Sequence, residues 1–210
     1  MIKKVVLLAS GGLDSTTMAF WLLDQKMEFV PLFINYGQHC ASTELKTLKA
    51  VLPQGLVDKI EVIDISSIYR HSNSKFIKAA NLWTDRVVAD DLYIPYRNIL
   101  ILTVAASFAQ TIECNDVYSA FINSNHAKEI DCSTEFFDRL ELILKDYGSV
   151  KIHMPFKTFS KYEVAKIGLK LNVPIGATFS CQASPEIPCG ACPNCVDRLT
   201  ALEMLEKDYK

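Results

Sequence analysis

The sequence lacks the features that mark membrane, fibrous and disordered proteins. It has no internal repeat, no low-complexity tract and no apolar run of the roughly 18 residues that a membrane-spanning helix needs. Half of its 210 residues are hydrophobic and 22% are charged, a composition that predicts a packed core. The length fits one domain with at most a small appendage, and no membrane partner is expected.

An excess of positive charge is also missing. The formal net charge is -2 at pH 7, so the chain has too little positive charge for the broad basic face that unspecific nucleic-acid binding needs. Nucleic acid is therefore not an expected partner. The apolar run at the N-terminus is short and ends in a Gly-Gly-Leu-Asp turn at 11–14 rather than in a cleavage site, so we expect no signal peptide and a cytoplasmic location.

Short apolar runs alternate with helical patterns along the chain. Strands are predicted at 5–9, 29–34, 60–65, 117–121 and 152–154, although Pro31 weakens the second near its start. Helices are predicted at 15–23, 43–52, 98–112, 133–144, 160–171 and the C-terminus. Residues 70–92 lack clear periodicity and are expected to form a long loop or partial helix over the functional site. This alternation predicts an α/β fold with a parallel twisted sheet and flanking helices, over 1–175, followed by a C-terminal segment at 176–210.

The first chemical motif is S-G-G-L-D-S at 10–15, between the first strand and the first helix. Glycine at 11 and 12 permits close approach and positive φ, and the helix N-terminus attracts a phosphate. The Walker lysine is replaced by Asp14, and the adjacent glycines exclude the G-x-G-x-x-G dinucleotide pattern. An acidic residue here would repel phosphate unless it binds Mg²⁺ or fixes the loop.

The second motif is C-x7-C-x2-C-x2-C, formed by Cys181, Cys189, Cys192 and Cys195. Seven cysteines, an odd number, argue against a disulfide framework. Four thiolates at this spacing suit a structural Zn²⁺ ion, while an iron–sulfur cluster is the serious alternative. The other three, Cys40, Cys114 and Cys132, show no partner spacing and are expected to be buried or half-buried residues, with Cys132 the least certain.

The hexad at 10–15 resembles the signature of the PP-loop ATP pyrophosphatase superfamily. That resemblance implies cleavage of ATP to AMP and pyrophosphate, with the adenylyl group activating a carboxylate, amide or urea oxygen. An activated carboxylate is open to attack by an amine, so the chain is expected to be a ligase that forms C–N bonds.

Both motifs together resemble the 7-cyano-7-deazaguanine synthase family, along almost the whole chain. The stretches 36–38 (Tyr-Gly-Gln), 95–98 (Pro-Tyr-Arg-Asn), 131–132 (Asp-Cys) and 168–181 add to the resemblance, with Lys161 and Glu163. It implies conversion of 7-carboxy-7-deazaguanine and ammonia to the nitrile, with two ATP, in queuosine biosynthesis.

The resemblance also implies roles for particular residues. ATP contacts are expected from Leu8, Ala9, Ser10, Gly11, Gly12, Leu13, Asp14, Ser15 and Thr16. Catalytic roles are expected for Asp14, Arg97 and Lys161, and Arg97 is the more suggestive because a cation at a helix start is electrostatically unfavourable. Substrate contacts are expected from Tyr36, Gln38, Phe121, Asp131 and Phe179. The expected cofactors are ATP, Mg²⁺ and Zn²⁺, and the expected assembly is a homodimer.

Several positions depart from the family pattern. The segment 120–133 keeps its length but not its sequence: Asn125 stands for an Asp, 127–130 (Ala-Lys-Glu-Ile) for Ser-Gly-Tyr-Pro, and Ser133 for an Arg. His39 and Gln182 also differ from the usual Arg and Tyr. These changes leave alternatives open: a paralogue that couples the acid to another amine, for instance on a protein, a non-catalytic nucleotide-binding zinc module, or a tRNA-thiolating relative.

Overall fold

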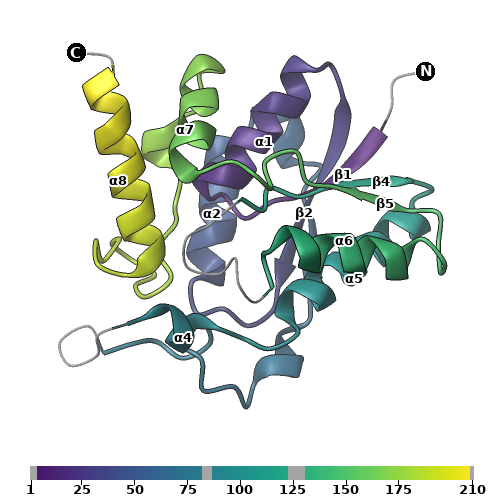
Figure 1. The fold of residues 1–210 in the computed structure, drawn as a ribbon, viewed down its shortest axis with the longest axis horizontal. Coiled ribbons are helices and arrows are strands. Elements are labelled where there is room, and N and C mark those ends of the chain that lie inside the picture. Colours follow the sequence, from purple (N-terminus) through teal and green to yellow (C-terminus); the bar gives the residue numbers. More distant parts are fainter. Residues whose placement is uncertain (1–3, 82–86, 123–130, 209–210) are drawn as a thin grey trace.

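The computed structural model describes residues 4–81, 87–122 and 131–208. Its centre is a five-stranded sheet with the order β3-β2-β1-β4-β5, in which every neighbouring pair is parallel (Figure 1). The strands are β1 (Lys4–Leu8), β2 (Glu28–Asn35), β3 (Glu61–Asp64), β4 (Asp116–Tyr118) and β5 (Lys151–His153). The α/β fold with a parallel sheet is thus confirmed.

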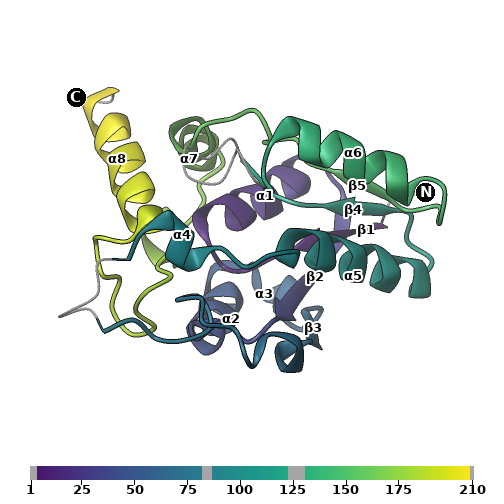
Figure 2. The ribbon, with the colours of Figure 1, turned by 60° about the horizontal axis from the view of Figure 1, so that its bottom comes forward.

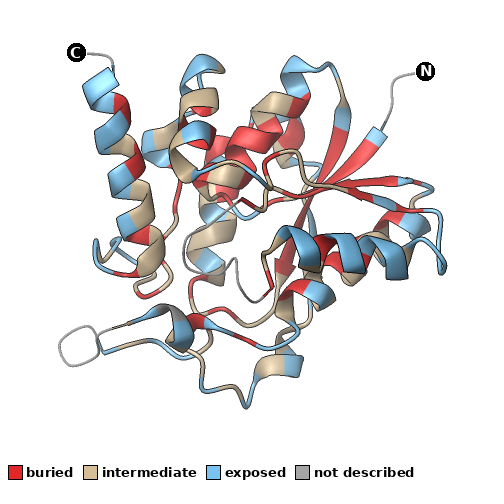
Figure 3. Ribbon diagram, viewed as in Figure 1, coloured by how far each residue is buried: buried red, intermediate tan, exposed pale blue. Residues whose placement is uncertain are grey.

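The central strand shows why a continuous apolar run folds this way. Val5, Val6 and Leu7 are all fully buried, because alternate side chains of β1 point to opposite faces and each face is covered. Val5 and Leu7 belong to one hydrophobic core, while Val6 belongs to the core on the other face. Figure 3 shows this buried stripe along the middle of the sheet.

Helices cover both faces of the sheet. On one face, α1 (Leu13–Asp24), α2 (Ala41–Val51) and α7 (Lys161–Lys170) bury apolar residues, and α8 (Pro193–Asp208) packs outside α7. On the other face lie α5 (Arg97–Thr111) and α6 (Thr134–Leu144), as Figure 2 shows from the side. Short helices complete the described chain: α3 (Gln54–Val57), α4 (Ala89–Leu92) and the 3-10 turns η1 (Ser66–Tyr69) and η2 (Ile175–Ala177).

Pro31 is the fourth residue of β2, a strand in the interior of the sheet. The carbonyl of Leu32 accepts the N–H of Ala9, so Leu32 faces β1 and Pro31 faces the opposite side by alternation. On that side β3 begins pairing only at Leu32, opposite Glu61. The missing N–H of the proline therefore removes no hydrogen bond between strands.

No helix in the described parts of the chain is both long and apolar enough to cross a membrane.

Candidate active site

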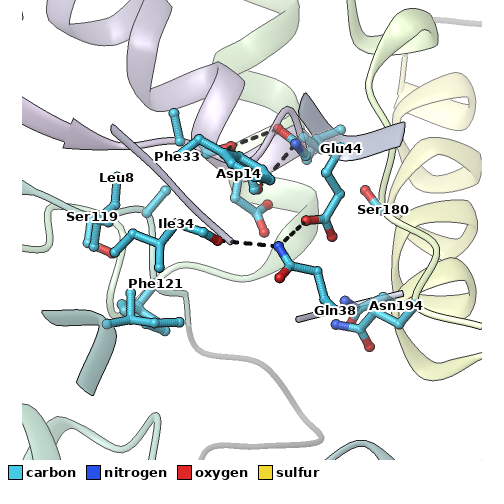
Figure 4. A pocket seen from close by; sticks show the side chains of 18 of the residues that line it. Leu8, Asp14, Phe33, Ile34, Gln38, Glu44, Ser119, Phe121, Ser180 and Asn194 are labelled. Atoms are coloured by element: carbon cyan, nitrogen blue, oxygen red, sulfur yellow. Dashed lines mark hydrogen bonds between the residues drawn. The ribbon is translucent and has the colours of Figure 1, made fainter. Parts of the chain in front are cut away.

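A cavity of about 290 Å³ opens at the carboxyl edge of the sheet, between β1 and β4. The connection from β1 leads to β2 on one side of it, whereas β4 lies on its other side, so the strand order reverses here. Open α/β sheets bind ligands at such a point. Residues after β1 and after β4 line the cavity, among them Ser10 and Ser119. Figure 4 shows Ser119 in this wall.

Gly11 fixes the turn after β1. Its φ is +76°, and an added Cβ would lie 2.7 Å from the backbone nitrogen of Leu48 and 2.8 Å from the carbonyl oxygen of Glu44, both on α2. Only glycine fits this approach. The positive φ expected at Gly12 is not found, because this residue has φ -72° and serves as the N-cap of α1.

The N-terminus of α1 is open toward the cavity. Gly12 supplies no side-chain cap, so the first N–H groups of the helix face the cavity with the positive end of the helix dipole. The loop is closed from within, since the hydroxyl of Ser15 donates to the carbonyl of Gly12 (3.3 Å) and accepts from the N–H of Ser10 (3.2 Å). This arrangement suits an anion such as a phosphate.

The expected ATP contacts fall into two groups. Seven of them line the cavity: Leu8, Ala9, Ser10, Gly12, Leu13, Asp14 and Ser15. Gly11 packs against α2 instead, and Thr16 is fully buried within α1.

Lys161 and Asp14 form an ion pair at the cavity wall, joining residues from opposite halves of the chain. The Lys161 side chain is 15% exposed and that of Asp14 22%. Lys161 is the first residue of α7, whose start is fixed by the predicted capping box between Ser160 and Glu163. The other carboxylate oxygen of Asp14, Oδ1, is buried and has no hydrogen-bond partner among the residues that the structure describes.

Arg97 begins α5 and points into the same cavity. Its guanidinium lies over the ring of Phe76 at 4.7 Å and over that of Tyr36 at 5.9 Å, and its Nε donates to the Asn98 side chain at 3.1 Å. Burial raises the pKa of Tyr36, and the neighbouring Arg97 opposes this rise. Phe76 was not predicted as a site residue, since it lies in the aperiodic segment 70–92.

Gln38 lines the cavity, but its amide is already occupied. It donates to the Ile34 carbonyl (3.3 Å) and to Glu44 (2.9 Å), and it accepts the N–H of Tyr36 (2.9 Å), as Figure 4 shows in part. Gln38 therefore holds Tyr36 and Glu44 in place in the cavity wall. Burial raises the pKa of Glu44 to about 7, against the hydrogen bond from Gln38 and the charge of Arg97, both of which lower it. Glu44 was missed because it reads as an ordinary surface residue of a helix.

A second lobe of about 210 Å³ adjoins the first. Asp14, Arg97 and Lys161 line both lobes, as does Phe121. Asp131 lines only the second lobe, while Phe179 lines only the first. The structure therefore brings together residues expected to contact ATP and residues expected to contact the substrate. Positions 123–130 of the divergent segment lie outside the described residues, and Ser133 caps α6 by accepting the N–H of Phe136.

The four cysteines of the second motif converge at the start of α8. Their sulfur atoms all lie within 4.8 Å of one another, and Cys181, Cys192 and Cys195 are buried. The pKa of Cys181 is lowered because Cys192 and Cys195 donate hydrogen bonds to its sulfur, and this raises the pKa of both donors. A cation bound by these sulfur atoms would favour their thiolate forms.

The other cysteines behave as expected. Cys40 and Cys114 are buried and Cys132 is half-buried, and all three are free thiols. Cys40 packs beside the cluster of four cysteines, and Cys114 donates to the Lys4 carbonyl at 3.1 Å.

The cysteine segment is tied directly to the first motif. The N–H of Phe179 donates to the carbonyl of Gly11 at 3.1 Å, and the ring of Phe179 packs among the cysteines. Arg198 on α8 holds the same stretch by donating to Thr178 and to the carbonyl of Ile175. Burial lowers the pKa of Arg198.

Two solved structures share this fold. They are the U34-tRNA thiolase NcsA from Methanococcus maripaludis with its 4Fe-4S cluster, and a 4-thiouridine synthetase in an RNA complex with bound ATP. Each has a TM-score of 0.52 and 15% sequence identity. They cover 99% and 98% of this chain, which spans 66% and 53% of theirs. The fold and the loop after β1 define an α/β protein of the PP-loop type.

The sequence comparison is more specific. A family model described as "Queuosine biosynthesis protein QueC" matches residues 4–206, and the chain belongs to this family. A 7-cyano-7-deazaguanine synthase of Thermoplasma volcanium is 32% identical, covering 95% of this chain and 86% of its own. One from Methanospirillum hungatei is 30% identical and covers 96% of each.

Proposed function

We propose that this protein is an ATP-dependent synthase that converts 7-carboxy-7-deazaguanine and ammonia into 7-cyano-7-deazaguanine. The observation that carries the proposal is the Asp14–Lys161 pair, which lies between a lobe that suits a nucleotide and a second lobe that suits a small acid. The names of the related synthases support the same substrate.

The chemistry requires ATP to be split between the α and β phosphates. A carboxylate has no good leaving group, and transfer of AMP to it makes an acyl-adenylate that ammonia can attack. The open N-terminus of α1 would hold the phosphates, with Lys161 and Arg97 stabilising the charge that develops as pyrophosphate leaves. A second round with ATP would remove the amide oxygen and leave the nitrile.

A magnesium ion fits the nucleotide lobe. Oδ1 of Asp14 is a buried oxygen with no partner among the described residues, and hard cations such as Mg²⁺ prefer carboxylate and phosphate oxygens. Asp14 would hold the ion, which would neutralise phosphate charge when bound. The same carboxylate is already oriented by Lys161.

The four cysteines fit one zinc ion better than an iron–sulfur cluster. Four thiolates around one Zn²⁺ at about 2.3 Å lie about 3.8 Å apart, compatible with the observed upper limit of 4.8 Å. In a four-iron cluster each cysteine binds a different iron, so the sulfurs lie farther apart. A closed shell of four ligands leaves no open position, and the site would be structural.

The test is a reaction with purified protein, ATP, Mg²⁺, 7-carboxy-7-deazaguanine and ammonium, followed by mass spectrometry. We expect the nitrile together with AMP and pyrophosphate, and pyrophosphate only when the acid is present. Formation of ADP and phosphate would refute the mechanism. A chain that binds ATP but releases no pyrophosphate under any of these conditions would be the non-catalytic module.

The divergent segment supports one alternative acceptor. Substitutions at 120–133 beside an intact ATP loop favour a changed second substrate, such as an amine on a protein. Adding a candidate partner peptide to the same reaction separates the two: a gain in peptide mass supports conjugation, and rapid nitrile formation from ammonium excludes it. The expected homodimer stays a prediction that light scattering can check.

A further inference from the structure

The second lobe combines aromatic walls with one buried carboxylate. Phe76 and Phe121 line it, and Tyr93, 37% exposed, completes the aromatic wall toward solvent. Asp131 is only 8% exposed, and its Oδ2 has no hydrogen-bond partner within the described ranges. A buried carboxylate oxygen without a partner is costly, so this atom is suited to a ligand that donates hydrogen bonds.

The start of α5 holds Asp131 in this position. Asn98 is 1% exposed and donates from Nδ2 to the Asp131 carbonyl at 3.1 Å. Its own Oδ1 accepts from Arg97 at 3.1 Å, so its orientation is fixed. The Cys132 sulfur makes only a long contact with Oδ1 of Asp131, at 3.9 Å. The carboxylate is therefore oriented through its backbone and remains available to a ligand.

We propose that Asp131 reads the base of the substrate by accepting hydrogen bonds from N1–H and the 2-amino group of the deazaguanine. The assignment rests on the function proposed above and names the residue that selects its base. An ionised carboxylate is an acceptor with two oxygens, and the guanine edge presents two adjacent donors. Phe76 and Phe121 supply faces against which a flat base stacks.

The position of Asp131 also orients the reacting group. In 7-carboxy-7-deazaguanine the carboxyl group lies at the opposite end of the bicyclic base from the N1–C2 edge. Asp131 lines only the second lobe, whereas Asp14 and Lys161 line both lobes. A base anchored at Asp131 thus directs its carboxyl group toward the nucleotide lobe, where it meets the α-phosphate. Burial raises the pKa of Asp131, and the charge of Arg97 opposes this rise.

The experiment measures acid-dependent pyrophosphate release with three bases: the 7-carboxy derivatives of 7-deazaguanine, 7-deazahypoxanthine and 7-deazaxanthine. For the unmodified protein, loss of the 2-amino group should lower kcat/KM about 10- to 100-fold. Asp131→Asn should reverse the preference toward the xanthine derivative, because an amide accepts from N1–H and donates to a 2-oxo group. Asp138→Asn, at an exposed aspartate of α6, is the matched control and should leave the order of preference unchanged.

Three results would overturn the assignment. One is an unmodified protein that uses the guanine and hypoxanthine derivatives equally well, a result that stands even if Asp131→Asn fails to fold. The second is an equal loss by Asp131→Asn for all three bases. The third is normal pyrophosphate release by Asp131→Asn without nitrile, which would place Asp131 at the amine step. In each case the deazaguanine acid still drives pyrophosphate release, so the proposed function survives; no release with any base would refute the function itself.

Discussion

At the scale of single residues, the Asp14–Lys161 pair is the part of the site most directly open to test. Lys161→Ala should lower the rate of acid-dependent pyrophosphate release about 100- to 1000-fold. The substitution removes a largely buried ammonium group that, in the proposed mechanism, stabilises the negative charge of the departing pyrophosphate. The measurement is kcat with saturating ATP and acid. Lys170→Ala, at the exposed end of the same helix, is the control and should keep its rate. An unchanged rate for Lys161→Ala would remove this lysine from the mechanism.

Glu44 should make stability depend on pH. Its folded pKa of about 7 exceeds the usual 4.5, so between these values the folded state binds more protons than the unfolded state. Stability should therefore fall as the pH rises from 4.5 to 7 and then level off. Glu44→Gln should remove this slope in urea unfolding measured from pH 5 to pH 8. Glu28→Gln, at an exposed strand end, should retain it, and a slope that persists in Glu44→Gln would contradict the assignment.

At the scale of elements, the start of α5 is strained at Tyr96. This residue has φ +64°, is 78% exposed and is the N-cap of α5, whose first residue, Arg97, lines the cavity. Left-handed backbone costs a non-glycine residue about 1–2 kcal/mol. Tyr96→Gly should therefore raise stability by about 1 kcal/mol, or the melting temperature by about 2–4 °C. Thermal melting of Tyr96→Gly beside Tyr96→Ala is the comparison, and equal melting temperatures for these two variants would contradict the strain.

The elements themselves followed from local patterns. The apolar run of β1 and the capping box at Ser160 predicted their structures correctly, because burial on two faces and helix capping are decided within a few residues. The short helix α3 was not predicted, since four residues carry too little periodicity.

The candidate site was predictable where a motif, or a stretch of resemblance to the family, is continuous in sequence. The S-G-G-L-D-S loop and the four cysteines meet this condition. Phe76 and Glu44 do not, because tertiary contacts place them in the cavity: Phe76 packs against Arg97, and Glu44 accepts a hydrogen bond from Gln38. Asp131 was expected from the resemblance at 131–132, but no spacing rule reveals that its Oδ2 has no hydrogen-bond partner among the described residues.

At the scale of the whole molecule, the cluster of four cysteines and its proposed zinc ion should affect ATP binding at the distant loop after β1. Cys192→Ser should lose the metal and about 3 kcal/mol or more of stability, a fall of about 6–12 °C in melting temperature. Its affinity for ATP should fall as well, because the Phe179 N–H that holds the Gly11 carbonyl comes from the cysteine segment. Elemental analysis and calorimetric titration with ATP measure both effects.

The control for this prediction is Cys114→Ser, which alters a buried thiol far from the cluster in sequence and should retain the metal. Iron with sulfide in the purified protein would contradict the zinc assignment. Full ATP affinity in a metal-free chain would contradict the coupling.

The bond between Phe179 and Gly11 also has a consequence for synthesis on the ribosome. The loop after β1 is made well before Lys161, Phe179 and Asn194, which line the same cavity. At the usual speed of translation the interval is on the order of ten seconds. A nascent chain therefore carries the loop at 10–15 before Lys161, which pairs with Asp14 of that loop, has been added. If Lys161 acts as proposed, a copy that ends before it should not consume ATP by this mechanism.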